Sequence, residues 1–370
     1  MKHTPLVDVH RRLGARLVDF GGWSMPLQYG SILEEGRTVR QACGLFDLGH
    51  MGRFVVEGPD ALQLVDRVCT NHAAKIPVGS IRYSLLCNEE GHPLDDLLIY
   101  RGERSVYLVV NASNTERDLV WIRDHAGDLE ATCRDVTEDE TMLALQGPRS
   151  PEILQQVVEG YDLAELKYYR FAFARVCGLD DVRISRTGYT GEDGFEIYFP
   201  PAEAERVWDA LLAVGAPAKL MPIGLGARDV LRLEAGMALY GHELDLESNP
   251  WEAGVDFAIA LTADKGDFVG RKGLERLKAN TTQRLVGITT PGPRVPRQGH
   301  ALALGEEQIG RVVSGGVSPT LEKNIGSAFV RLGHDAAGQE LELDVRGKRQ
   351  ACTVCELPFY SRTRKKKKAK

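Results

Sequence analysis

Hydrophobic and polar residues alternate with two different periods along the chain, and a first mixed stretch runs from residue 53 to 127. Apolar residues recur at helical spacing over 61–69. A second helical pattern follows Asn114, a residue type that caps helices, and ends near Gly127. Strand-like apolar runs cover residues 53–57, 81–87, 94–100 and 105–110. The stretch therefore predicts mixed α and β structure.

Two further stretches have their own patterns. The second begins with a strand over 141–146 and predicts a helix through Ile153 and Val157, strands over 182–187 and 195–199, and helices over 202–214 and 227–235. From about Arg284 onward, short apolar runs over 285–289, 310–314, 327–331, 340–345 and 352–357 alternate with Gly and Pro turns. This last pattern is typical of an all-β barrel or sandwich.

Length and charge change this picture in one respect. The 370 residues exceed a single small module and predict two or three domains. The formal net charge is −6, but the last ten residues carry 7 of the 46 positive charges and no acidic residue. Residues 1–360 then hold 39 positive and 52 negative charges, a net −13. This acidic body argues against nucleic-acid binding as the main function.

The sequence does not indicate a membrane protein, an exported protein or a metal site. The longest run without charged residues covers 20–33, and its 14 residues include three Gly and one Pro. A membrane span needs about 18 to 20 apolar residues, and the N-terminus lacks the apolar segment of a secretory signal. Seven scattered cysteines favour a reducing compartment. Cys352 and Cys355 are expected on opposite faces of one strand, and the nine histidines do not cluster.

Asp95 and Asp96 are the first candidates for chemistry, because they interrupt the apolar strand LDDLLIY. Adjacent strand residues face opposite sides, so these carboxylates are not expected to act as one pair. At least one should be half-buried, where a carboxylate must find a hydrogen-bond donor or shift its pKa. On these residues alone, a structural Asp bonded to a backbone N–H is favoured over a functional one.

A glycine-rich turn, RTGYTGEDGFE, is the second candidate. Its three glycines are Gly188, Gly191 and Gly194, and they are expected to allow positive φ values and the close approach of a planar ligand. Tyr189 and Glu196 bracket the turn. A plain hairpin explains the pattern equally well, and the spacing is not that of a dinucleotide fingerprint.

An arginine pair is the third candidate, in the segment IGLGARDVLRLEAGMALYGHELD. Arg228 and Arg232 lie one helical turn apart on the same face. Two guanidinium groups in this arrangement can hold a carboxylate-bearing ligand. By itself, however, such a pair is more often part of a solvated helix face.

Together these segments resemble a known family, the aminomethyltransferases (T-proteins) of the glycine cleavage system. The resemblance rests on VDFGGWSMPLQYGSI, GLFDLGHMG, DDLLIY followed by VVNAS, SRTGYTGEDGFE, GLGARDVLRLEAGMALYGHELD and VSPTLEKNIG. These motifs occur in order from about Thr4 to Tyr360. The resemblance implies transfer of a one-carbon unit from the aminomethyl group on the lipoyl arm of H-protein to tetrahydrofolate. The products are 5,10-methylenetetrahydrofolate, ammonia and dihydrolipoyl H-protein.

The resemblance also implies an α+β fold of three domains around a central channel that holds the folate, with a C-terminal β-barrel domain. The first α+β domain is expected over 1–52 and 128–245, and the second over 53–127 and 246–280. The barrel is expected over 281–360. Residues 361–370 are expected to form a basic, disordered tail.

Site residues follow from the same resemblance, position by position. Asp96 is expected to be the catalytic carboxylate, which contacts the reacting folate nitrogen. The folate-binding positions fall on Tyr83, Asn111, Tyr189, Glu196 and Arg228, and Arg228 is expected to pair with the glutamate carboxylate of the folate. A C-terminal pocket residue falls on Arg362, although Arg364 stays open as an alternative.

The implied partners and location complete the prediction. Tetrahydrofolate is the co-substrate, no metal is expected, and lipoylated H-protein is the protein partner, with the P- and L-proteins involved indirectly. Neither a membrane nor a specific nucleic acid is expected. Because the resemblance begins at Thr4, a bacterial cytoplasmic protein is the simplest reading, and a mature form without its presequence is the other. The functional alternative is a folate-binding relative in iron-sulfur assembly, but its K-G-C-Y type motif is absent.

Overall fold

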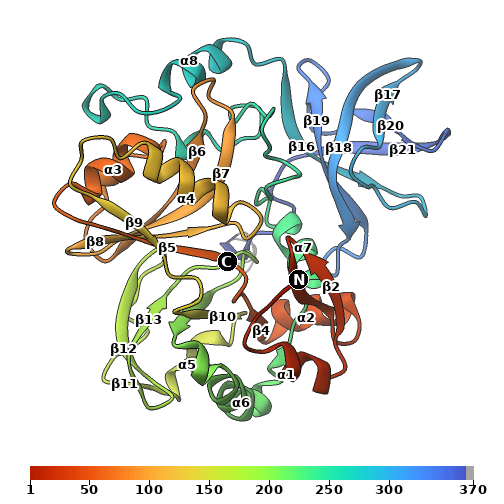
Figure 1. The fold of residues 1–370 in the computed structure, drawn as a ribbon. Helices are drawn as coiled ribbons and strands as arrows, with labels where there is room; N and C mark the ends of the chain where they lie inside the picture. The colour runs from red at the N-terminus through yellow and green to blue at the C-terminus, as the bar shows by residue number, and fades with distance from the viewer. Residues whose placement is uncertain (364–370) are drawn as a thin grey trace.

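The computed structural model describes residues 1–363, which form three groups of elements (Figure 1). A five-stranded sheet with its helices, drawn in orange and yellow, lies above a seven-stranded sheet drawn mainly in green. A closed six-stranded barrel, drawn in blue, lies to one side of both. This mixture of helices, sheets and barrel confirms the predicted α+β class. The domain boundaries given above stay a prediction.

The five-stranded sheet is antiparallel and has two apolar faces. Its strands, in spatial order, are β6 (Ser80–Cys87), β7 (Pro93–Arg101), β8 (Ser105–Val110), β5 (Gly52–Glu57) and β9 (Thr132–Asp135). Helices α3 (Ala61–Val68) and α4 (Thr115–Asp124) cover one face, with Val65 and Ile122 in the shared core. The other face, with Tyr100 and Tyr107, packs against the seven-stranded sheet. Because β7 alternates, Asp95 faces the helices with Leu97, while Asp96 faces the second sheet.

The seven-stranded sheet provides the opposite layer. Its strands, in spatial order, are β11 (Val158–Glu159), β12 (Phe171–Val176), β13 (Leu179–Ser185), β14 (Gly194–Phe199), β10 (Thr141–Gln146), β4 (Gly44–Asp47) and β15 (Met221–Pro222). The helices of this part are α1 (Val7–Arg12), α2 (Ile32–Gln41), α5 (Ser150–Gln155), α6 (Ala204–Gly215) and α7 (Leu225–Glu234). Trp208 of α6 is fully buried in the core beneath this sheet. A small sheet joins β1 (Lys2–His3), β3 (Trp23–Gln28) and β2 (Arg16–Phe20).

The C-terminal strands close into a barrel, so the predicted alternative of a sandwich is wrong. In sequence order they are β16 (Gln283–Thr290), β17 (Ala301–Leu304), β18 (Glu307–Val317), β19 (Asn324–Arg331), β20 (Glu340–Val345) and β21 (Lys348–Cys355). The sequence pattern missed only β17, which has four residues. The other elements are α8 (Arg271–Ala279) and the short 3-10 helices η1 (Ala73–Lys75), η2 (Pro201–Glu203), η3 (Ala216–Ala218), η4 (Asp256–Ala258) and η5 (Ala263–Lys265).

A buried ion pair joins α2 and α7 to the barrel. The carboxylate of Glu234, which is fully buried at the end of α7, accepts hydrogen bonds from Arg40 Nη2 at 2.7 Å and Arg40 Nε at 3.0 Å. The barrel contributes Thr320, whose N–H and hydroxyl donate to the same carboxylate at 3.0 and 2.8 Å. The ring of Tyr360 lies 3.9 Å from the Arg40 guanidinium. Arg40 also lies 3.2 Å from the buried carboxylate of Glu192, so segments distant in the sequence depend on one buried cluster of charges.

The structure also describes the seven cysteines and the helices that were considered as possible membrane spans. All seven cysteines are free, and on β21 Cys352 is buried while Cys355 is half-buried. Within residues 1–363, no helix is long and apolar enough to cross a membrane. Most of the expected basic tail, including Arg364, lies outside the described residues.

Candidate functional site

A cavity of about 240 Å³ lies between the two large sheets. Leu98 and Val109 of the five-stranded sheet and Met142 of the seven-stranded sheet form apolar walls. The segments 236–239 and 253–257 close its sides. Six of the seven predicted site residues line this cavity: Tyr83, Asp96, Asn111, Tyr189, Glu196 and Arg228. Strands and helices far apart in the sequence therefore place these polar groups around one volume.

Asp96 is held by two donors on the cavity wall. Tyr83 donates its hydroxyl to Asp96 Oδ2 at 3.0 Å, and the Asn111 side chain donates to Asp96 Oδ1 at 2.9 Å. The same Asn111 Nδ2 also donates to Asp95 Oδ1 at 2.8 Å. The two carboxylates therefore share one amide although their side chains leave opposite faces of β7.

The environment of Asp96 raises the pKa of its carboxyl group toward 7. Burial raises the pKa of the Asp96 carboxyl to about 7, and the negative charge of Asp95 adds to this effect, while the hydrogen bonds from Tyr83 and Asn111 act in the opposite direction. The charge of Asp95 therefore acts on Asp96 although the two side chains lie on opposite faces of β7. A carboxylate with a pKa near 7 can exchange a proton at physiological pH. Burial and the Asp96 charge raise the pKa of Tyr83, which stays a donor.

Asp95 is a structural group behind the cavity wall. It is fully buried, and it accepts the Asn111 N–H at 2.9 Å and the Asn114 side-chain amide at 2.6 Å. Asn114 was expected to cap α4, but its side chain makes no cap hydrogen bond because it binds this carboxylate instead. Asp118, one helical turn further along α4, is also fully buried, and burial and the Asp95 charge raise its pKa well above the usual range. No motif or spacing in the sequence pointed to Asp118.

Glu196 faces the cavity from the opposite sheet. Three hydroxyl groups donate to its Oε2 atom: Thr187 at 2.6 Å, Tyr100 at 3.2 Å and Tyr198 at 3.2 Å. These bonds fix the carboxylate through one oxygen, which leaves the other oxygen for a donor in the cavity. Burial raises the pKa of Glu196, and the hydroxyl groups oppose this shift. Sequence reasoning missed all three hydroxyls, because they come from positions read only as strand residues.

Arg228 and Tyr189 form the third polar group. The guanidinium of Arg228 lies 4.4 Å from the Tyr189 ring, whose hydroxyl donates to the backbone oxygen of Ala238. Among the described residues, no carboxylate lies within 4.0 Å of the Arg228 guanidinium. Burial lowers the pKa of Arg228. A buried guanidinium beside a cavity is suited to bind a carboxylate of a ligand.

Arg232 does not share this role, and it is not on a solvated face either, so both alternatives given for the arginine pair are wrong for Arg232. It donates to Glu243 at 2.7 Å, to Ser314 at 2.6 Å and to Asp229 at 2.9 Å, and its side chain is buried. Its hydrogen bonds join α7 to the barrel strand β18. Of the two arginines on α7, Arg228 thus lines the cavity and Arg232 binds the barrel.

Glycines in the turn before β14 serve two purposes. Gly191 has a φ of 78°, as the sequence suggested. Gly188 and Gly194 do not have positive φ values, which corrects the expectation for them. A Cβ atom at either position would lie within 2.3 Å of the Gln146 side-chain amide. They are therefore required for close packing against β10.

Arg362 is not among the residues that line the cavity. Its guanidinium lies 3.4 Å from Asp193 Oδ1 and 5.1 Å from the centre of the Tyr168 ring. A folate contact of Arg362 stays a prediction, and Arg364 lies outside the described residues. Within 1–363, no group of three or more His, Cys, Asp or Glu side chains is arranged to hold a metal ion.

Comparisons with known proteins agree in family. The family model described as GCVT N-terminal domain matches residues 6–263, and the glycine cleavage T-protein C-terminal barrel domain matches residues 283–361. An aminomethyltransferase of Symbiobacterium thermophilum is 49% identical over 367 residues, 97% of each chain. One of Geobacillus kaustophilus is 45% identical over 98% of this chain and 100% of its own. The crystal structure of glycine cleavage system aminomethyltransferase T from Bartonella henselae superposes with a TM-score of 0.90 at 34% identity, covering 97% of this chain and 98% of its own.

Proposed function

The chain belongs to the glycine cleavage T-protein family, whose members are folate-dependent aminomethyltransferases, and from this premise we propose what its cavity does. The cavity transfers the one-carbon unit of an aminomethyl group, carried on the lipoyl arm of H-protein, to tetrahydrofolate. The products are 5,10-methylenetetrahydrofolate, ammonia and dihydrolipoyl H-protein. The P- and L-proteins act on the same H-protein and meet this chain only indirectly. We place the enzyme in a bacterial cytoplasm, supported by the bacterial origin of the relatives.

One observation carries the proposal: Asp96 faces Glu196 and Arg228 across one cavity. These groups fit tetrahydrofolate, because the unoccupied acceptor of Glu196 suits the N–H edge of a pterin and Arg228 suits the glutamate carboxylate. Tyr189 and the apolar walls suit its aromatic rings. Tetrahydrofolate supplies the nucleophilic nitrogens that take up the one-carbon unit.

The residues of the chain do three things in this reaction. Glu196 and Arg228 orient the folate at its two ends. Ionised Asp96 accepts a hydrogen bond from the reacting amine and stabilises the positive charge that develops at the transferred carbon as ammonia leaves. Tyr83 and Asn111 hold the Asp96 oxygens in place through the two bonds described above.

The direct test is to incubate the protein with aminomethylated H-protein and tetrahydrofolate and to measure ammonia and methylenetetrahydrofolate. We expect ammonia release that depends on folate and matches methylenetetrahydrofolate in amount. If folate binds but ammonia release does not depend on it, the non-enzymatic folate-binding relative is the better description.

Replacing Arg228 by Ala should weaken tetrahydrofolate binding by roughly 1.5 to 3 kcal/mol, the usual loss for a hydrogen bond to a charged group. Isothermal titration calorimetry measures this change directly. Arg16→Ala is the control, because Arg16 is exposed on β2 and does not line the cavity. Equal affinity of the Arg228→Ala variant and the wild type would remove Arg228 from the folate site.

The pH profile of transfer should report Asp96. With its pKa raised to about 7, turnover should fall as the pH drops below 7, since protonation removes the charge that the reaction needs. Tyr83→Phe removes a hydrogen bond that lowers this pKa. A lost bond of about 1 kcal/mol should move the acidic limb upward by roughly 0.7 pH units. A limb that stays in place, or moves to lower pH, argues against Asp96 as the titrating group.

A further inference from the structure

The cavity opens to solvent beside Phe257. Of the residues that line it, only Gly236, Gly254 and Phe257 are exposed, and only Phe257 has a side chain. This side chain is 69% exposed, the second highest value among the large hydrophobic residues of the described chain. Gly254 has open space where a Cβ atom would lie. The segment 254–257 therefore forms the rim of the cavity, and Phe257 is its apolar group.

Phe257 lies next to the reacting carboxylate. Its ring stacks on Tyr83, with ring centroids 5.5 Å apart and planes inclined by 29°. The hydroxyl of Tyr83 donates to Asp96. A molecule that enters from solvent along this side thus meets Phe257, then Tyr83 and then Asp96.

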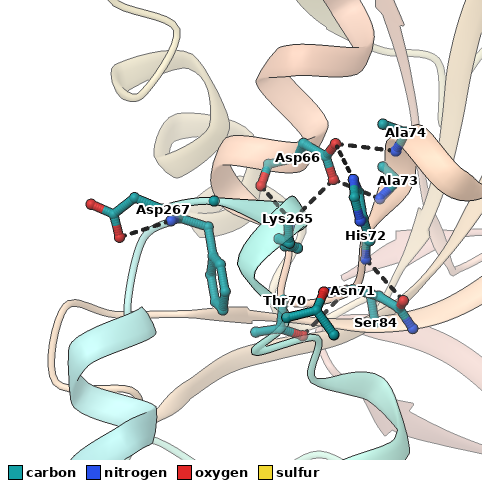
Figure 2. Close-up of polar contacts among 12 residues, drawn as sticks. Asp66, Thr70, Asn71, His72, Ala73, Ala74, Ser84, Lys265 and Asp267 are labelled. Carbon is teal, nitrogen blue, oxygen red and sulfur yellow. Dashed lines mark hydrogen bonds and ion pairs between the residues drawn. The ribbon is translucent and has the colours of Figure 1, made fainter.

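Hydrogen bonds to residues 66 and 70 hold the segment that carries Phe257. Figure 2 shows Lys265 reaching Asp66 of α3, and its buried ammonium donates to the Asp66 backbone oxygen at 2.7 Å and to Oδ1 at 3.0 Å. Thr70 donates its hydroxyl to the backbone oxygen of Ala258 at 2.8 Å. The N–H of Ala260 donates to the backbone oxygen of Thr70 at 2.9 Å. The exposure of Phe257 is therefore a feature of an anchored segment.

The segment 66–74 also holds Tyr83, the ring on which Phe257 stacks. Asn71 donates its side-chain amide to the backbone oxygen of Tyr83 at 3.0 Å, and its N–H to Ser84 Oγ at 2.9 Å. Asp66 in turn accepts the N–H of Ala73 at 2.6 Å and that of Ala74 at 3.1 Å (Figure 2). The backbone near Phe257 and that of Tyr83 are thus both bonded to residues 66–74, which fixes the rim of the cavity relative to its wall.

We propose that Phe257 is a substrate-binding residue that contacts the apolar thioalkyl arm carrying the aminomethyl group. This rests on the proposed function. Folate has its polar partners on the seven-stranded side and on α7, at Glu196 and Arg228. The arm is an alkyl chain with sulfur, and both gain by contact with an aromatic face. An exposed aromatic ring at a cavity rim is a typical place for an apolar ligand.

The test is Phe257→Ala, together with Phe257→Leu, which keeps an apolar side chain. We expect the KM for aminomethylated H-protein to rise about tenfold for Ala, the scale for losing most of the apolar contact of a Phe, and clearly less for Leu. The KM for tetrahydrofolate should stay within about twofold, a change too small to indicate a lost contact. Phe173→Ala is the matched control, because Phe173 is 53% exposed on β12 and does not line the cavity.

A second probe isolates the arm from the rest of the partner. Free aminomethyl-dihydrolipoamide should show the same rise in KM with Phe257→Ala, since the contact is with the arm. A rise confined to H-protein would assign Phe257 to protein docking, a rise in the KM for folate would assign it to folate, and unchanged KM values would leave it without a role; each overturns the proposal. Wild-type protein without folate-dependent ammonia release would instead refute the proposed function itself.

Discussion

Asp96→Asn should reduce aminomethyl transfer by about 100-fold or more, the usual loss when an acid-base or electrostatic group is removed. The amide has the shape of the carboxylate but carries no charge, so it cannot stabilise positive charge at the transferred carbon. Asn111 can still donate to the amide oxygen, and the Tyr83 hydroxyl can accept a hydrogen bond from the new NH2 group, which keeps the cavity wall in place. Single-turnover ammonia release measures the loss, and calorimetry with tetrahydrofolate should show nearly unchanged binding.

Two aspartates serve as controls for this variant. Asp124→Asn, at the exposed end of α4, should leave turnover unchanged. Asp95→Asn should lower the thermal stability, because its new amide would meet the donors of Asn111 and Asn114. Turnover of Asp96→Asn within a few-fold of the wild type would exclude Asp96 as the reacting group.

Sequence reasoning placed part of this site correctly. Alternation along β7 predicted that Asp95 and Asp96 lie on opposite faces, and the structure confirms it. It could not predict that Asn111, from the end of the neighbouring strand, donates to both carboxylates. Such contacts depend on how strands pair, which periodicity does not specify.

The wrong predictions have a common physical cause. Asn114 has the residue type and position of a helix cap, but a buried carboxylate is the stronger partner for its amide. Arg232 shares a face with Arg228, but Glu243 and Ser314 take up its guanidinium. In both cases a long-range polar contact replaced a local one. By contrast, β10 was predicted at its observed bounds, because all six of its residues are buried and form one apolar run.

Glu234→Ala should destabilise the folded protein by about 3 to 5 kcal/mol, the usual cost of breaking a buried ion pair by removing one partner. In the described part of the chain, the variant leaves Glu192, at 3.2 Å, as the one carboxylate beside the buried Arg40 guanidinium, and it removes the acceptor of both Thr320 donors. The contact of α2 and α7 with the barrel should weaken first, since Thr320 belongs to the barrel side. Urea unfolding followed by circular dichroism should show a lower midpoint or a separate early transition.

An exposed ion pair between α2 and the barrel loop that holds Thr320 provides the control. Arg37, also on α2, lies 3.3 Å from Glu322, two residues after Thr320, but both side chains are exposed. Arg37→Ala should therefore change the unfolding free energy by at most about 1 kcal/mol. Because Arg40 also donates to Thr320, both pairs lie where α2 meets the same loop, and the difference between the variants reflects burial. Equal and small effects of Glu234→Ala and Arg37→Ala would show that the buried Arg40–Glu234 pair does not hold the barrel.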